Sequence, residues 1–398
     1  MLPRLYTLLA SLVTAAAALQ ATNSTAIAPR VMIVSMFEPE SQIWFDQFNT
    51  SGLGDIANTS VPVVGMSMLF PHVYCTASHE ICQVTVGEGE INAAASTIAL
   101  ILSSKFDLRS TYWLLGGIGG VNPERATLGS VGFARYAVQV ALQYEIDGRD
   151  VPEDWVTGYI PYGQKDPRGY PTITYGTEVF ELNANLRDLA VKHASQATLE
   201  DQSGPQAYRA KYEDVPSFKT GAQPPAIVKC DIATSDVYYT GHRLAQAFDQ
   251  TIDIWTNGTG EYCMSAQEDN AVLEGLVRGA VEGLVDFSRV IVYRVGSNFD
   301  RPPPGRTDYQ HLTEQDQNGF EISVRNTYNA GIEIVRGIVK GWNCTFAKGV
   351  APDNYIGDIF GSLGGRPDYG LGSITQGKKA KPAQFATRLH QRRRAARK

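Results

Sequence analysis

Long apolar runs are missing from this chain beyond its first twenty residues. The one candidate, residues 7–19, follows a short cationic start and ends in small residues. A helix that crosses a bilayer needs about 20 apolar residues, so this run is too short to span a membrane. It is typical of a secretory signal peptide, and we expect residues 1–21 to be removed and to leave a chain without a membrane span.

Cysteine and histidine are also scarce, at five and six residues. So few cysteines exclude a disulfide scaffold, and no Cys/His cluster has the spacing of a zinc site, so we expect neither a metal nor another cofactor. Cys75 and Cys82 are near enough in sequence to close a small loop. That pair would leave one odd thiol among Cys230, Cys263 and Cys344, and the sequence does not decide the pairing.

Basic residues are concentrated at the C-terminal end. The formal net charge is −6, yet residues 378–398 hold nine Lys or Arg and no acid, which leaves the remainder at −15. We expect residues 374–398 to be a solvated, disordered tail, with attachment to an anionic wall polymer or nucleic acid as the alternative for this segment. The acidic body argues against nucleic acid as the main partner.

Glycosylation sequons, by contrast, are frequent. The five acceptor residues are Asn23, Asn49, Asn58, Asn257 and Asn343. Asn-x-Ser/Thr sites are used in a secretory pathway. Together with the leader they predict an extracellular glycoprotein that is secreted or held in the cell wall.

Short apolar runs alternate with helix-like stretches between residues 30 and 300. The runs predict buried strands at residues 31–36, 83–87, 111–117, 131–134, 226–230 and 290–295. Helical periodicity marks residues 91–102, 178–193 and 270–285. Such alternation predicts an α/β protein with a central, mostly parallel sheet covered by helices. Residues 150–225 are rich in Pro, Gly, Tyr and charge, and we expect long loops around one helix there.

Polar or glycine-rich segments follow four of these strands. They are Phe37-Glu38-Pro39-Glu40, Gly87-Glu88-Gly89-Glu90, residues 116–120 and Gly296-Ser297-Asn298-Phe299-Asp300. Ligands of open α/β sheets bind beyond the carboxyl ends of the strands, so we expect these segments to converge on one site. Their acids, amides and backbone N–H groups would suit a hydroxyl-rich ligand that carries a flat polar base.

Each segment alone has a plainer explanation. Glycine clusters are more often tight turns, and residues 116–120 lack both the Lys-Ser/Thr of a P-loop and the spacing of a dinucleotide fingerprint. The four glutamates of the first two segments would by default be solvated surface acids. Gln267-Glu268-Asp269-Asn270 would by default cap a helix and complement its dipole. Position at the ends of buried strands is what favours a functional role for the acids.

Six motifs also occur in a distinctive order. They are Met36-Phe-Glu-Pro-Glu40, Gly87-Glu-Gly-Glu-Ile-Asn-Ala-Ala-Ala95, Leu115-Gly-Gly-Ile-Gly-Gly-Val-Asn-Pro123, Gly129-Ser-Val-Gly, Ala266-Gln-Glu-Asp-Asn270 and Tyr293-Arg-Val-Gly-Ser-Asn298. Their order resembles the fungal purine nucleoside permease family over residues 28–365. That family is more distantly similar to nucleoside phosphorylases and adenosine-type nucleosidases. The resemblance implies a three-layer, nucleoside-phosphorylase-like α/β fold, with a mixed central sheet flanked by helices.

The same resemblance implies roles for individual residues. Glu40 takes the place of the nucleosidase acid that activates the attacking water. Glu268, beside Gln267, takes that of the glutamate that grips the ribose hydroxyls. Tyr238 lies in a segment similar to the one whose aromatic ring packs on the base. We therefore predict Glu40 as catalytic, and Gln267, Glu268 and Tyr238 as substrate-binding residues.

Ser297-Asn298 falls where the nucleosidases carry Ser-Asp, whose aspartate protonates N7 of the leaving purine. An amide can hydrogen-bond O6 or N7 of a purine but cannot give up a proton at neutral pH, so base recognition would stay and acid catalysis would be lost. Some phosphorylases specific for 6-oxopurines also have asparagine there, which favours 6-oxopurines here. Asn298 is the second predicted catalytic residue, and Ser297, Gly89 and Gly117 complete the predicted binding set.

Three functions are compatible with these residues. The family name implies nucleoside uptake, but a chain without membrane spans could only capture ligand for a separate transporter. The second is a secreted purine nucleosidase or phosphorylase, and the third is a storage or wall protein that has lost the chemistry. A phosphate nucleophile needs a well-placed Arg, and none follows the first strand, so water is the predicted nucleophile and phosphate the alternative. We also expect a homo-oligomer.

Overall fold

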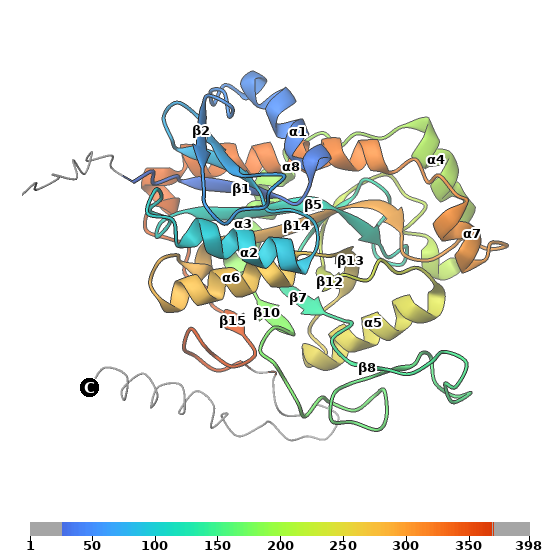
Figure 1. Cartoon of the computed structure of the whole chain (residues 1–398). Helices are drawn as coiled ribbons and strands as arrows, with labels where there is room; N and C mark the ends of the chain where they lie inside the picture. The colour runs from blue at the N-terminus through green and yellow to red at the C-terminus, as the bar shows by residue number, and fades with distance from the viewer. Residues whose placement is uncertain (1–25, 368, 370–398) are drawn as a thin grey trace, which may run out of the picture.

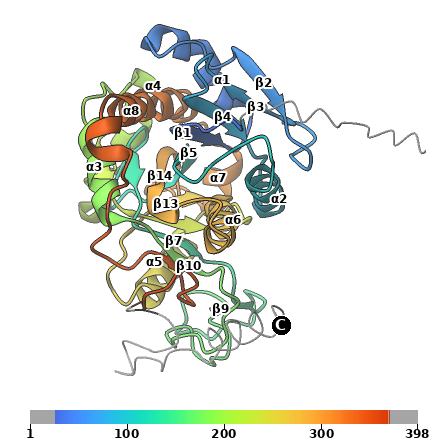
Figure 2. The ribbon, with the colours of Figure 1, turned by 90° about the vertical axis from the view of Figure 1, so that its left-hand side faces the viewer.

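The computed structural model describes residues 26–367 and 369 (Figure 1). The predicted signal peptide at residues 1–21, the sequon at Asn23 and the basic tail at 374–398 lie outside the described residues. Within them, the chain forms a mixed β-sheet with helices on both sides, as Figure 2 shows. This confirms the predicted α/β class and the mixed central sheet.

Fifteen strands occur in the described part of the chain. They are β1 (Val31–Ser35), β2 (Thr59–Pro62), β3 (His72–Cys75), β4 (Ile81–Thr85), β5 (Tyr112–Val121), β6 (Val131–Phe133), β7 (Tyr136–Gln139), β8 (Tyr144–Glu145), β9 (Tyr159–Ile160), β10 (Val179–Glu181), β11 (Ile227–Lys229), β12 (Asp231–Thr234), β13 (Tyr262–Ala266), β14 (Val290–Phe299) and β15 (Gly357–Asp358). Thirteen of them form the main sheet, and β8 pairs with β9 alone.

Parallel and antiparallel pairs are mixed throughout the main sheet. At its centre, β1 pairs in parallel with β4 and β5, and β5 pairs in parallel with β14. Antiparallel pairs join β13 to β5, β3 to β4 and β10 to β7. The sheet is therefore mixed, which confirms what the family resemblance implies. The mostly parallel sheet predicted from the alternation of elements is wrong.

Eight α-helices pack around this sheet in the described residues. They are α1 (Glu38–Gln47), α2 (Glu90–Ile101), α3 (Ala184–Ala194), α4 (Ser203–Arg209), α5 (His242–Trp255), α6 (Asp269–Val281), α7 (Asp308–Thr313) and α8 (Phe320–Lys340). In Figure 2, α3 and α8 cover one side of the sheet and α2 and α6 the other. Within residues 26–367, no helix combines the length and the apolar character that crossing a membrane requires.

The central strands are rich in apolar residues and are covered on both faces. Every residue of β1 and β4 is buried, as expected for strands covered by helices on each side. Small residues let the helices approach: a Cβ at Gly275 of α6 would lie 2.7 Å from Thr97 of α2. The same close approach lets α8 pass over the sheet, because a Cβ at Gly331 would lie 2.5 Å from the hydroxyl of Tyr293.

Three local predictions were wrong. Residues 116–120 were expected to follow a strand, but they lie inside β5, and β14 likewise continues to Phe299. The helix expected at 178–193 begins at Ala184, because Val179–Glu181 form the buried strand β10 of the sheet. The segment 150–225 contains two helices, α3 and α4, rather than one.

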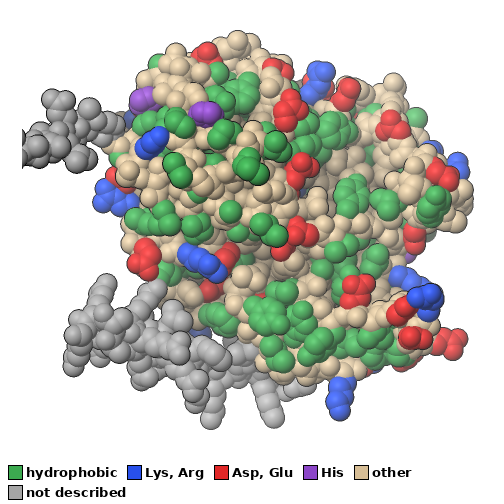
Figure 3. Space-filling model, viewed as in Figure 1, with side chains coloured by type: hydrophobic (Ala, Val, Ile, Leu, Met, Phe, Trp, Pro, Cys, Tyr) green, Lys and Arg blue, Asp and Glu red, His purple; other side chains and the backbone are tan. Residues whose placement is uncertain are grey.

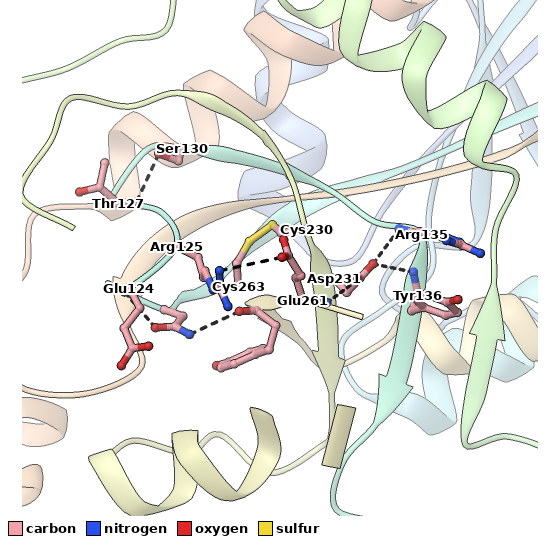
Figure 4. The surroundings of a disulfide bond; sticks show 12 residues. Glu124, Arg125, Thr127, Ser130, Arg135, Tyr136, Cys230, Asp231, Glu261 and Cys263 are labelled. Atoms are coloured by element: carbon pink, nitrogen blue, oxygen red, sulfur yellow. Dashed lines mark hydrogen bonds and ion pairs between the residues drawn. A yellow bond between two sulfur atoms is a disulfide. The ribbon is translucent and has the colours of Figure 1, made fainter. Parts of the chain in front are cut away.

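Two disulfides are formed and one cysteine is free. Cys75 and Cys82 are opposite each other in the β3–β4 pair, and Cys230 is bonded to Cys263 of β13, while Cys344 is free and exposed. Figure 4 shows Asp231 beside the second disulfide. Its buried carboxylate accepts hydrogen bonds from the backbone N–H groups of Arg135, Tyr136 and Glu261. Disulfide and carboxylate together tie β12 to the start of β13.

We expect removal of the Cys230–Cys263 disulfide to destabilise the fold, because the bond closes a 33-residue loop that carries β12. Replacing both cysteines by serine should lower the free energy of unfolding by about 2–4 kcal/mol in a urea titration. Cys344→Ser is the matched control and should unfold like the wild type. Equal unfolding midpoints for all three proteins would show that the bond does not stabilise the fold.

Candidate functional site

A cavity of about 450 Å³ opens at the carboxyl ends of β1, β5, β13 and β14. The wall is completed by residues 235 and 237–240, after β12, and by residues of the stretch 311–320, which runs from the second half of α7 to the first residue of α8. Three of the four segments predicted to converge contribute lining residues. They are the segment that follows β1 and the segments that form the ends of β5 and β14. The fourth, after β4, contributes the exposed Glu88 at the cavity edge.

Glu40 is the most buried carboxylate that lines the cavity, at 1% exposure. Helix α1 begins at Glu38, and Pro39 and Glu40 lie in its first turn, so that the Glu40 carboxylate points back over the end of β1. Its Oε2 accepts a hydrogen bond from the Met36 N–H at 2.8 Å, and its Oε1 accepts one from the Ile118 N–H at 2.7 Å. The side chain therefore joins the end of β1 to the middle of β5.

Burial raises the pKa of Glu40 to about 7, because the ionised carboxylate has lost most of its hydration. Arg294, 3.9 Å away, opposes this rise and lowers the pKa, while the neighbouring Glu268 raises it. The two backbone hydrogen bonds also favour the charged form. Glu40 is thus a group that can gain or lose a proton near neutral pH, as a general base must.

Arg294 of β14 lies beneath the cavity and is only 2% exposed. Its guanidinium donates to Asp269 at 2.6 Å and to Glu268 at 3.2 Å, and it donates to the Ile118 carbonyl at 3.1 Å. Sequence reasoning missed both Arg294 and Asp269. The available signal was an arginine inside an otherwise apolar strand, since a buried cation requires partners.

Glu268, at the start of α6, lines the cavity opposite the first strand end. Its Oε1 accepts a hydrogen bond from the Gly89 N–H at 3.0 Å, and its Oε2 faces Arg294. Burial raises the pKa of Glu268 and Arg294 lowers it. Each carboxylate oxygen still has a lone pair for a ligand, because an ionised carboxylate accepts up to about four hydrogen bonds.

Two of the predicted binding glycines support the carboxylates and are not among the lining residues. Gly89 donates its N–H to Glu268, and Gly117 leaves room for Glu40. A Cβ at Gly117 would lie 2.2 Å from Oε1 of Glu40 and 2.8 Å from Arg294. The glycines of β5 are therefore required by close packing inside the strand, not by a turn.

The other predicted residues all line the cavity. Ser297 and Asn298 lie near the end of β14, where the register with β5 shifts between Gly296 and Asn298. Gln267 donates to the Asp236 carbonyl at 3.1 Å, and Tyr238 lies at the edge with 59% of its surface exposed. The wall at 311–320 was not predicted, because it follows no strand and belongs to none of the recognised motifs.

Comparison with known proteins gives a match to the purine nucleoside permease family model over residues 28–351. The chain belongs to this family. It is 43% identical over 353 residues to a purine nucleoside permease of Candida albicans, covering 87% of this chain and 84% of the relative. It is 37% identical over 323 residues to a probable purine nucleoside permease of Schizosaccharomyces pombe, and the match covers 79% of this chain and 90% of the relative.

Solved structures similar to this permease-family chain include two 5′-methylthioadenosine/S-adenosylhomocysteine nucleosidases. For the one from Neisseria meningitidis the TM-score is 0.45 and the sequence identity is 13%. The match covers 78% of this chain and 99% of the nucleosidase chain. For the one from Streptococcus pneumoniae, solved with a transition-state inhibitor, the TM-score is 0.45 and the sequence identity is 15%. The match covers 77% of this chain and 99% of the nucleosidase chain.

We expect Gly117→Ala to disturb the site of this family member, because the new methyl group would collide with Glu40 and Arg294. Such overpacking should lower the free energy of unfolding by about 1–3 kcal/mol. Gly148→Ala is the control, since a Cβ there meets nothing within 4 Å. A urea titration in which both variants unfold at the same midpoint would contradict the close packing of Glu40 on Gly117.

Proposed function

We propose that this protein takes part in nucleoside uptake by binding purine nucleosides in the cavity, and that it cleaves their N-glycosidic bond with water. The observation that carries the proposal is the pair Glu40 and Glu268, two buried carboxylates on either side of Arg294 in one cavity. Purine nucleoside is also the ligand in the names of both relatives. A volume of about 450 Å³ is within the usual range of small-molecule sites.

The ribose is assigned to the side of Glu268. Its carboxylate has free lone pairs and is fixed by Gly89 and Arg294, so two hydroxyl groups of a sugar can donate to it without rearrangement. Hydrogen bonds to a charged group contribute about 1.5–3 kcal/mol each. The base then lies toward Asn298 and Tyr238, which line the remaining wall.

In the proposed reaction, a water oxygen forms a bond to the C1′ carbon of the ribose while the bond from C1′ to the base nitrogen breaks. Ionised Glu40 takes the proton that the water releases. The electron pair of the broken bond moves onto the purine, where a hydrogen bond from Asn298 stabilises it, and the base takes its proton from solvent. The nearby carboxylates stabilise the positive charge that develops on the ribose.

Water is favoured over phosphate by the charges around the cavity. Among the described residues that line it, Arg294 is the only Arg or Lys, and its donors are directed at Asp269, Glu268 and the Ile118 carbonyl. Glu40 and Glu88 add negative charge, which would repel a phosphate ion. Capture of nucleosides without cleavage is the second candidate, and it is favoured by Asn298, which cannot protonate the leaving base.

Secretion, glycosylation and self-association are part of the proposal. Two disulfides and the exposed sequon residues Asn49, Asn58 and Asn343 suit an oxidising, secretory route. Figure 3 shows hydrophobic side chains over α2 and the loop before β3, which agrees with a covered surface between copies. The exposed large apolar residues in and next to these two segments are 68–96% exposed, and they are Val64, Met68, Leu69, Ile91 and Leu102.

Protein recovered from culture medium should lose mass on enzymatic deglycosylation, and light scattering of the same sample should give a multiple of the chain mass. Recovery only from the membrane fraction would reject secretion. A monomeric mass would reject self-association.

We expect the wild type to release hypoxanthine from inosine without phosphate, and Glu40→Gln to lower this rate about 10²–10⁴-fold while inosine still binds. Because Glu40 must be ionised and its pKa is about 7, the wild-type rate should fall about tenfold per pH unit below that value. Chromatography of the free base over a pH series measures both effects.

Glu38→Gln is the matched control, since Glu38 is an exposed carboxylate in the same helical turn. Its rate and pH profile should equal those of the wild type. Release of base only when phosphate is added would establish a phosphorylase instead. Binding of inosine with no release under either condition would reject cleavage and leave capture.

A further inference from the structure

We propose that Asp269 is a positioning residue for the reaction: it holds the Arg294 guanidinium away from Glu40, so that the Glu40 carboxylate is free to act on water. This inference rests on the proposed function, because it assumes that Glu40 activates the nucleophile. Asp269 is fully buried and is not among the residues that line the cavity, so it acts through Arg294 and not on the ligand.

The guanidinium is turned toward Asp269 and not toward Glu40. Its Nη2 donates to Oδ1 of Asp269 at 2.6 Å, and its Nε lies 3.2 Å from both oxygens of the same carboxylate. From Nη1 to Oε1 of Glu40 the distance is 3.9 Å, which is too long for a hydrogen bond. Two nitrogens bound to one carboxylate fix the plane of a guanidinium, so Asp269 also decides where the third nitrogen points.

The third nitrogen is engaged by the backbone next to Glu40. Nη1 of Arg294 donates to the Ile118 carbonyl at 3.1 Å, while the Ile118 N–H donates to Oε1 of Glu40 at 2.7 Å. The backbone of Ile118 thus contacts both charged groups and takes the donor that is nearest to Glu40. The two groups attract each other across this residue without forming a hydrogen-bonded pair.

The start of α6 keeps Asp269 in this position. Asp269 is the first residue of the helix, where the helix dipole favours a negative charge. Glu268 before it accepts a hydrogen bond from the Gly89 N–H at 3.0 Å, and Asn270 after it donates to the Thr177 carbonyl at 2.7 Å. The carboxylate is therefore held from both sides, and the guanidinium is held with it.

The surroundings of Glu40 make this separation matter. The charged and titratable groups that face it in the described residues are Arg294 and Tyr293 of β14 and Glu268 of α6. Burial raises the pKa of Tyr293 well above its usual value, so this group is neutral. Arg294 is the cation among them. A closer Arg294 would favour the ionised form of Glu40 and make it a weaker base.

We expect Asp269→Asn to lower the pKa of Glu40 by about one unit, because Arg294 loses its closest anion and moves toward the remaining carboxylates. Asp269→Ser, which is neutral and smaller, should shift this pKa in the same direction. The acid limb of the inosine cleavage profile should move to lower pH, and the rate on the alkaline plateau should fall, because a carboxylate with a lower pKa is a weaker base. Infrared difference spectra between each variant and its Glu40→Gln counterpart measure the midpoint of the Glu40 band without ligand.

Two further variants separate control of charge from damage to the fold. Replacing Asp269 by Asn and Arg294 by Met together removes the cation with its partner, so the Glu40 midpoint should rise by about one unit. Asp300→Asn is the matched control, because Asp300 is also a buried carboxylate paired with an arginine, at 2.8 Å from Arg301. It should leave the Glu40 midpoint near pH 7.

An unchanged Glu40 midpoint in Asp269→Asn or Asp269→Ser, in a protein that a thermal melt shows to be folded, rejects the inference. The proposed function then stands if the wild type releases hypoxanthine. Failure of both neutral variants to fold would show that Asp269 serves stability alone, and it also rejects the inference. If the wild type releases no base from inosine, the proposed cleavage fails and the inference fails with it.

Discussion

The pairing of Arg294 with Asp269 is the interaction on which the site depends. A guanidinium with 2% exposure is stable only if its charge and its donors are satisfied, and Asp269 provides the closest contact, at 2.6 Å. The remaining donors then fix Glu268 and the Ile118 carbonyl. Because Asp269 already offsets the charge, Arg294 only partly counters the burial of Glu40, whose pKa is raised to about 7.

The strands are shaped around this group of charges. Gly117 has no side chain, so Glu40 and Arg294 can both lie against β5. Farther along β5, a Cβ at Gly119 would lie 1.9 Å from the Ser265 carbonyl oxygen, so glycine is required for β13 to cross there. Glu40, Glu268 and Asn298, to which we assign the activation of water and the binding of the sugar and the base, thus line one cavity around this strand.

Strand position and the family resemblance together pointed to Glu40, Ser297 and Asn298, and the structure places all three at one cavity, because strands that end at the same edge bring their ends together. Asp269 and Arg294 were missed, since a buried ion pair has no periodicity and its partners are 25 residues apart. The glycines of β5 were predicted to follow the strand, because sequence alone does not show which neighbours approach the backbone. The wall at 311–320 depends on how α7 packs, which only the folded chain shows.

The central claim is that Glu40 holds a proton up to about neutral pH, and its carboxyl vibration reports this directly. Infrared difference spectra between the wild type and Glu40→Gln, recorded over a pH series without ligand, isolate the C=O band of this one protonated carboxyl. We predict a band that disappears with a midpoint near pH 7. A band that is already absent at the ordinary pKa of glutamate, about 4.3, would contradict the claim, because Glu40 would then be ionised throughout the neutral range.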